Sequence, residues 1–239
     1  MPERAAGAAV SVIIPVFDNE AYLGEAIESV LGQSMPPGEV VVVDDGSTDG
    51  SAAIAEAFGG KVRVVRQANM GISGARNRGV AETSGSLLAF LDADDRWLPR
   101  RLEVQLDALK ADPGLELLFG AVAQVRAEDW AATVSGREPV DVVIPGTLCS
   151  TILVTRAAFT QVGGFDVRWR AGEFIDWFAR ARDAGVHTLG LPQVLVWRRI
   201  HSKNHGIRQR AAYRDYLGVV KASLDRRREA ASRDGTSEA

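Results

Sequence analysis

The chain has 239 residues, of which 46% are hydrophobic and 25% charged, and this balance excludes a disordered or collagen-like protein. Its 28 Lys and Arg residues against 31 Asp and Glu residues leave a net charge of −3, so the chain offers no overall positive field for a nucleic acid. A single cysteine, Cys149, excludes an internal disulfide and a cysteine-based zinc site. With only three histidines, a metal site would depend on Asp and Glu oxygens, which favours Mg²⁺ or Mn²⁺.

The sequence carries no pattern for export or for spanning a membrane. Its first apolar run, 10–16, is too short for the core of a signal peptide, and no window reaches the roughly 18 apolar residues of a transmembrane helix. We therefore expect a cytoplasmic protein without a transmembrane segment. Peripheral contact with a membrane and the oligomeric state stay open.

Strands and helices alternate over the first 110 residues. Short, β-branched apolar runs predict strands buried on both faces, and apolar residues at helical spacing predict the helices. The expected strands are 10–16, 39–43, 61–66 and 86–91; the expected helices are 20–33, 51–58, a short one opening in the glycine-rich stretch 69–79, and one from Pro99. This alternation predicts right-handed βαβ units and a doubly wound, mainly parallel α/β sheet.

The second half of the chain is less regular. The expected strands are 115–125, 150–154, 186–191 and 194–200; the expected helices are a short one ending at Gly163, 173–184 and 207–228; and 126–145 is expected to be irregular. No linker-like segment or internal repeat divides the chain. We therefore expect one continuous domain over 1–239, with a nucleotide-binding half at about 10–110, a mixed half at about 111–206, and a C-terminal helix and tail at about 207–239.

Six of the aspartates lie in two loops, each directly after a predicted strand: Asp44, Asp45 and Asp49, and then Asp92, Asp94 and Asp95. Ligands of open parallel sheets bind at the carboxyl ends of the strands, so both loops are expected to face one crevice. Turn formation and helix capping explain the first cluster about equally well. A divalent cation is favoured at the second cluster, because neighbouring unpaired carboxylates repel each other.

Four segments resemble, in this order, the successive motifs of family 2 glycosyltransferases with the GT-A fold: VSVIIPVFDNE (10–20), VVVDDGSTD (41–49), GARNRG (74–79) and FLDADD (90–95). The resemblance is specific in order and spacing over 10–101 and looser beyond. It implies an inverting enzyme that takes a sugar from a nucleotide-diphosphate donor, usually a UDP-sugar, with Mn²⁺ or Mg²⁺.

The resemblance also implies roles for residues of the first two motifs. Pro15, Phe17 and Glu20 match the loop that lines the nucleoside pocket. Asp44, with Asp45 beside it, matches the acid that binds uracil.

The third and fourth motifs match positions around the diphosphate. Arg76 matches a position close to the donor, where a cation suits phosphate. Asp92 and Asp94 match the DxD motif, which places Asp92 near the ribose and on the metal, and Asp94 on the metal. Asp95 is interpreted as a residue that orients its neighbours.

The base that would deprotonate the acceptor is expected in the second half. Family members carry Glu-Asp there, the Asp being the base, whereas in this chain Glu173 is followed by Phe174 and the next acid is Asp176. Glu173 and Asp176 are three positions apart on a predicted helix start, so both can face one crevice. Asp176 is narrowly preferred, with Glu173 close behind; charge complementing the helix dipole is the alternative.

Basic residues after the last predicted strand complete the expected site. His201 is a candidate metal ligand, with His205 as its substitute, and Arg199 is expected near the diphosphate. A solvated or hydrogen-bonded histidine is an equally good interpretation of His201.

The resulting hypothesis is an inverting glycosyltransferase. A nucleotide-sugar-binding protein without turnover is the alternative, because the base motif is altered. A nucleotidyltransferase is less favoured, because the loop 17–20 after the first strand has no glycine or cation. The acceptor stays open among sugars, lipid-linked carriers, peptides and small molecules.

Overall fold

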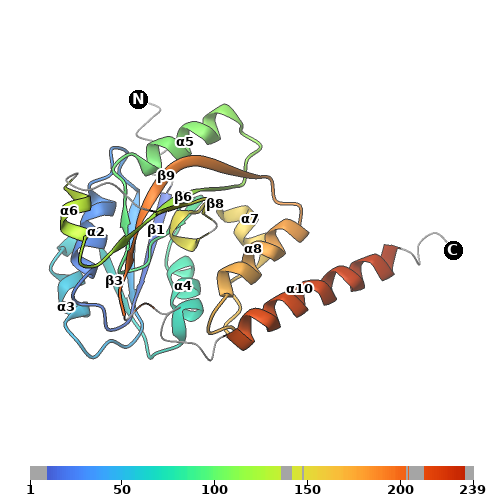
Figure 1. Cartoon of the computed structure of the whole chain (residues 1–239), viewed down its shortest axis with the longest axis horizontal. Coiled ribbons are helices and arrows are strands. Elements are labelled where there is room, and N and C mark those ends of the chain that lie inside the picture. Colours follow the sequence, from blue (N-terminus) through green and yellow to red (C-terminus); the bar gives the residue numbers. More distant parts are fainter. Residues whose placement is uncertain (1–9, 136–141, 147, 203, 205–212, 235–239) are drawn as a thin grey trace.

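The computed structural model describes residues 10–135, 142–146, 148–202, 204 and 213–234. These residues form a single mixed sheet with helices on both faces (Figure 1). The strands are β1 (Val10–Val16), β2 (Glu39–Asp44), β3 (Arg63–Arg66), β4 (Leu87–Phe90), β5 (Arg96–Trp97), β6 (Leu117–Arg126), β7 (Val142–Ile144), β8 (Leu153–Thr155) and β9 (Thr188–Ile200). The expected α/β fold class is confirmed.

The strands follow the order β3-β2-β1-β4-β8-β6-β9-β5, and β7 pairs with β6. The first four are mutually parallel, whereas β8 is antiparallel to both β4 and β6. Because the chain order reverses beside β1, the loops after β1, β2 and β4 gather at one edge of the sheet. The loops after β2 and β4 are the ones that carry the two aspartate clusters.

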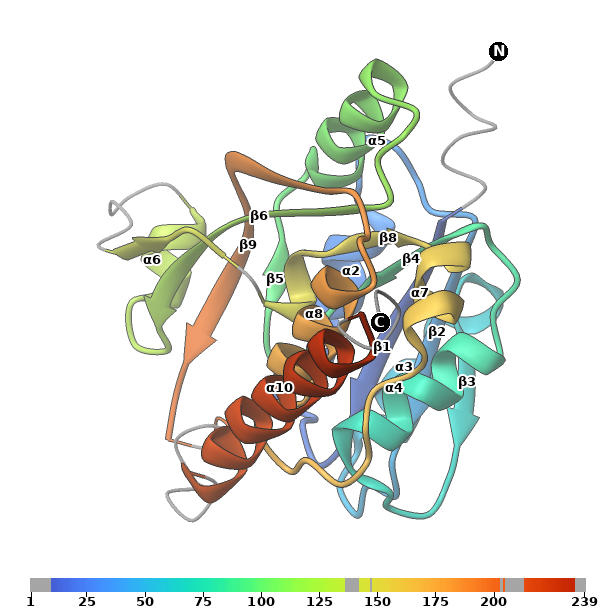
Figure 2. The same cartoon turned by 90° about the vertical axis from the view of Figure 1, so that its right-hand side faces the viewer.

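The helices are α2 (Leu23–Leu31), α3 (Ser51–Glu56), α4 (Gly71–Ala81), α5 (Arg101–Ala111), α6 (Trp130–Val134), α7 (Arg156–Val162), α8 (Glu173–Asp183) and α10 (Tyr213–Asp234), with 3₁₀ turns η1 (Gly59–Lys61) and η2 (Cys149–Thr151). Side chains of β1 alternate between two cores. Helices α2, α3 and α5 cover one face, and α4, α7 and α8 cover the other. Helix α10 packs on α8 and extends away from the sheet (Figures 1 and 2).

Several expectations for the second half were wrong in detail. The expected strands 186–191 and 194–200 are one strand, because β9 accommodates Pro192 at a bulge where its register against β6 shifts. The segment expected to be irregular contains α6 and β7. The residues 149–151 form a 3₁₀ turn before β8 rather than part of a strand. Among the described residues, no helix is long and apolar enough to cross a membrane.

Two helix glycines allow a paired test of the packing between α4 and β1. A Cβ on Gly79 would lie 2.3 Å from Cγ2 of the buried Ile13, whereas a Cβ on Gly24 of α2 would meet Cγ2 of Ile54 at an ordinary 3.9 Å. We predict that Gly79→Ala lowers the free energy of unfolding by about 1–3 kcal/mol through overpacking. Gly24→Ala should raise it by about 0.5–1 kcal/mol through helix propensity. Urea titration measures both, and equal effects would contradict the close packing at Gly79.

Candidate active site

The loops after β1 and β2 are fastened to each other. Thr48 N donates to Asp18 Oδ1 at 2.7 Å, and Gly50 N donates to Glu20 Oε2 at 2.7 Å. Asp18 adopts a positive φ of 47°. The preceding residue, Phe17, lies just beyond the end of β1 and is 50% exposed. Of the predicted nucleoside residues, Phe17 and Glu20 are therefore exposed at the sheet edge, and Pro15 is buried in β1.

Both aspartates at the end of β2 are buried and hydrogen-bonded to backbone N–H groups. Asp44 Oδ1 accepts from Ser47 N at 2.9 Å, which stabilises its own turn. Asp45 Oδ1 accepts from Gln67 Nε2 at 2.7 Å and from Met70 N at 2.9 Å, the residue before α4. Turn formation is thus part of what these residues do, and their contact with a nucleoside stays a prediction.

Arg76 joins the two halves of the chain. Its side chain is 2% exposed, and it donates from Nη2 to Asp92 Oδ1 and from Nη1 to Glu173 Oε1, both at 2.7 Å. The arginine comes from α4, Asp92 from the loop after β4, and Glu173 from the first turn of α8. The structure thereby places a carboxylate of the second half beside the DxD segment.

Asp94 lies against residues from the end of β9. Its Oδ2 is 3.0 Å from His201 Nε2 and accepts from Asn204 Nδ2 at 3.0 Å. Burial raises the pKa of Asp94, and the charge of Asp92 raises it further, while His201 opposes this shift. Asn204 is not among the residues that the sequence predicts for the site, although its position three residues after His201 offers a signal.

Asp95 is buried behind these residues. It accepts from Ser150 Oγ and from Arg199 N, both at 3.2 Å. Burial, followed by the charges of Asp94 and Asp92, raises the pKa of Asp95 well above its usual range.

The guanidinium of Arg199 lies between two rings on the α2 side of the sheet. Its Cζ is 4.3 Å from the centroid of Tyr22 and 3.8 Å from that of Trp130, and its Nη2 donates to Glu25 Oε2 at 2.9 Å. Its Nε donates to the backbone oxygen of Asp94 at 3.3 Å. The structure does not bring Arg199 to Arg76 and Asp92, and its contacts are those of a packed side chain.

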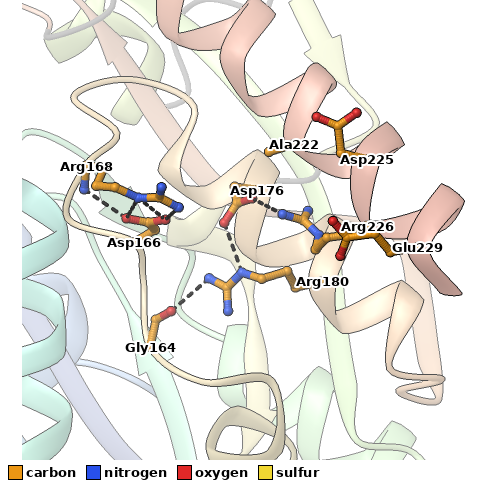
Figure 3. Close-up of a pocket in the computed structure, with 9 residues that line it drawn as sticks. All are labelled: Gly164, Asp166, Arg168, Asp176, Arg180, Ala222, Asp225, Arg226 and Glu229. Carbon is orange, nitrogen blue, oxygen red and sulfur yellow. Dashed lines mark hydrogen bonds and ion pairs between the residues drawn. The ribbon is translucent and has the colours of Figure 1, made fainter.

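Asp176, the preferred base from the sequence, has different partners from those of Glu173. Its carboxylate is 2% exposed and accepts from Arg180 Nε at 2.9 Å and from Arg226 Nη1 of α10 at 3.0 Å. It lines a cavity of about 570 Å³ between α8, α10 and the turn at Gly164 (Figure 3). Phe174 is buried against Trp177 and Phe178. The structure therefore brings Asp92, Arg76 and Glu173 into direct contact and sets Asp94 against His201. Asp176 binds Arg180 and Arg226 instead, and the identity of the base stays a prediction.

In the described part of the chain, no cluster of three or more His, Cys, Asp or Glu side chains is arranged to hold a metal ion. His205 lies outside the described residues.

The sequence and the fold can now be set beside known proteins. The family model "Glycosyl transferase family 2" matches residues 11–131, so this chain belongs to glycosyltransferase family 2. An uncharacterized glycosyltransferase of Nostoc sp. is 45% identical over 98 residues, 39% of this chain and 30% of that protein's length. One of Rickettsia prowazekii is 28% identical over 229 residues, 89% and 71% of the two lengths.

Solved structures confirm the GT-A type fold. Staphylococcus aureus TarS 1–349 in complex with UDP-GlcNAc superimposes with a TM-score of 0.74 at 21% identity, covering 90% of this chain and 65% of that one. TarS 1–349 in complex with UDP gives a TM-score of 0.66 at 21% identity, covering 81% and 61%. At this identity the likeness concerns the fold.

The contacts of Asp176 predict a role in stability. Asp176→Asn removes the charge that two arginines share, and we expect a loss of about 2 kcal/mol in the free energy of unfolding, less than for a fully buried pair because Arg180 and Arg226 contact water. Asp183→Asn on the same helix, whose carboxylate is more exposed at 27%, is the matched control. It should cost below about 1 kcal/mol. Chemical denaturation measures both, and no difference between the variants would contradict the assignment.

Proposed function

We propose that this chain is an inverting glycosyltransferase that transfers a sugar from a nucleotide-diphosphate donor, with UDP as the nucleotide, to an acceptor hydroxyl. The observation that carries the proposal is the bridge by Arg76 between Asp92 and Glu173. The two terminal nitrogens of this one guanidinium each bind a carboxylate, one from the DxD segment and one from the second half. Donor binding by the first and proton removal by the second would then take place side by side.

The proposed donor rests on two observations. The residues Phe17, Asp44, Asp45 and Asp92 lie at or just after the ends of strands that finish at the same edge of the sheet. TarS, whose fold this chain shares, forms complexes with UDP and UDP-GlcNAc. The particular donor sugar is left to experiment.

The donor set at Asp94 suits Mn²⁺ or Mg²⁺. Asp94 Oδ2 and His201 Nε2 are 3.0 Å apart, a separation that two ligands of one cation can adopt, and Asp92 belongs to the same loop. Diphosphate oxygens would supply the remaining ligands. Bound there, the cation would neutralise the charge that develops on the leaving diphosphate.

Glu173 is the proposed base. The acceptor oxygen forms a bond to the anomeric carbon from the face opposite the diphosphate, its proton passes to the Glu173 carboxylate, and the bond between the anomeric carbon and the diphosphate oxygen breaks. Arg76 orients Glu173 toward the Asp92 side. Asp176 is a poorer candidate, because two arginines occupy its oxygens.

The acceptor follows from neither sequence nor fold. Sugars, lipid-linked carriers, peptides and small molecules all bear suitable hydroxyls. The match covers only 30% of the length of the Nostoc relative.

Donor and metal use can be tested together. With a panel of UDP- and GDP-sugars, we predict Mn²⁺-dependent release of UDP that EDTA abolishes. Asp94→Ala should weaken Mn²⁺-dependent UDP binding, measured by titration calorimetry, by about 100-fold, because it removes a charged ligand. Asp107→Ala, on the exposed face of α5, is the control. Unchanged binding by Asp94→Ala would contradict the metal site.

The base can be tested separately. Glu173→Gln should lower kcat by about 10²–10⁴-fold and leave the affinity for UDP within a few fold, because only proton transfer is lost. Asp176→Asn, assayed well below its unfolding temperature, should keep its turnover. Full turnover by Glu173→Gln would return the role to another acid. UDP binding with neither hydrolysis nor transfer by the wild type across the panel would favour the binding protein without turnover.

A further inference from the structure

The 3₁₀ turn η2, Cys149–Thr151, is held by side chains that precede or belong to α5. Three successive carbonyl groups accept hydrogen bonds: Ser150 O from Trp97 Nε1 at 3.2 Å, Thr151 O from Gln105 Nε2 at 2.9 Å, and Ile152 O from Arg101 Nη2 at 2.8 Å. Arg101 and Gln105 are fully buried, and the guanidinium of Arg101 stacks on Trp97 at 3.6 Å. Because a polar side chain is costly to bury without a hydrogen bond, these contacts favour one position of the turn.

One hydroxyl of η2, that of Ser150, contacts the loop Asp92–Asp95. Ser150 is 1% exposed, and its Oγ accepts from Asp92 N at 3.2 Å and donates to Asp95 Oδ2 at 3.2 Å. A hydroxyl has one proton to donate and can accept as well, so Ser150 satisfies both ends of this loop at once. Neither Trp97, Arg101 nor Gln105 makes a hydrogen bond to these aspartates.

Asp95 also connects the loop Asp92–Asp95 to β9. Asp95 Oδ1 accepts from Arg199 N at 3.2 Å, and His201, two residues farther along, contacts Asp94. The DxD loop is thus fixed between η2 on one side and the end of β9 on the other.

We propose that Ser150 is a positioning residue for the DxD loop, holding Asp92 and Asp94 in the geometry that binds the cation and the donor diphosphate. The inference rests on the proposed function. Ser150 touches no reacting atom; it acts through the backbone of Asp92 and the carboxylate of Asp95. Partners of this kind, once removed, typically cost 10–100-fold in metal affinity.

Thr151 supplies a matched control in the same turn. Its side-chain Oγ1 donates to Leu148 O at 2.8 Å and has no hydrogen bond to the aspartates. Ser150→Ala and Thr151→Val each delete one buried hydroxyl from η2, but only the first should alter the DxD loop. Ser150→Cys keeps a side chain of similar shape that can form a weak hydrogen bond. It is the second variant to measure if Ser150→Ala folds poorly.

The experiment measures Mn²⁺ binding to each full-length variant in the presence of UDP by electron paramagnetic resonance, together with the Mn²⁺ dependence of UDP release and the unfolding temperature. Ser150→Ala should raise the Mn²⁺ concentration for half-saturation by about 10–100-fold in both assays, with Ser150→Cys in between. For Thr151→Val, the Mn²⁺ concentration for half-saturation should stay within about twofold of the wild-type value, even if its unfolding temperature falls as far as that of Ser150→Ala.

Equal shifts for Ser150→Ala and Thr151→Val would overturn the positioning role and leave a structural one. Asp94→Ala separates this failure from that of the proposed function. Wild-type Mn²⁺ binding by Asp94→Ala would overturn the proposed metal site. If Asp94→Ala loses Mn²⁺ binding while Ser150→Ala and Ser150→Cys bind Mn²⁺ as the wild type does, only the role of Ser150 is overturned.

Discussion

Anionic partners stabilise a guanidinium that is removed from water, and Arg76 finds two of them in parts of the chain that are far apart in sequence. Asp92 is 16 positions away and Glu173 is 97. Separating the arginine from either carboxylate would leave a buried charge without compensation, which costs more than a surface ion pair ever contributes. The bridge therefore helps to hold the first turn of α8, and it pairs Asp92 with an acid of the second half.

The same electrostatic constraint organises the loop after β4. Three carboxylates lie within four residues, and burial together with mutual repulsion raises the pKa of Asp94 and Asp95. The fold relieves this by surrounding the loop with donors from distant segments: Arg76 from α4, Ser150 from η2, and Asn204 beyond β9. Such an arrangement is suited to accepting a cation, because part of the repulsion remains among the protein's own groups.

Sequence patterns predicted the first half of the fold well for local reasons. The run 10–16 consists mostly of apolar, β-branched residues, which favour a strand buried on both faces, and β1 has those bounds. The patterns failed where long-range pairing outweighs local signals. Pro192 looks like a break, yet β9 continues through it because β6 supplies ten residues of partner strand. The two residues of β5 are too few to form a pattern at all.

The candidate site divides along the same line. The sequence by itself determined which acids follow buried strands, and hence that Asp44, Asp45, Asp92 and Asp94 reach one edge of the sheet, because strand direction follows from alternation of strands and helices. Only the tertiary structure showed that Glu173 and Asp176 have different partners. Three positions apart on a helix, the two acids stand about one turn from each other, and the packing of α8 between α4 and α10 directs Glu173 to Arg76 and Asp176 to Arg226. No local pattern encodes that rotation, because it depends on side chains from helices that are distant in sequence.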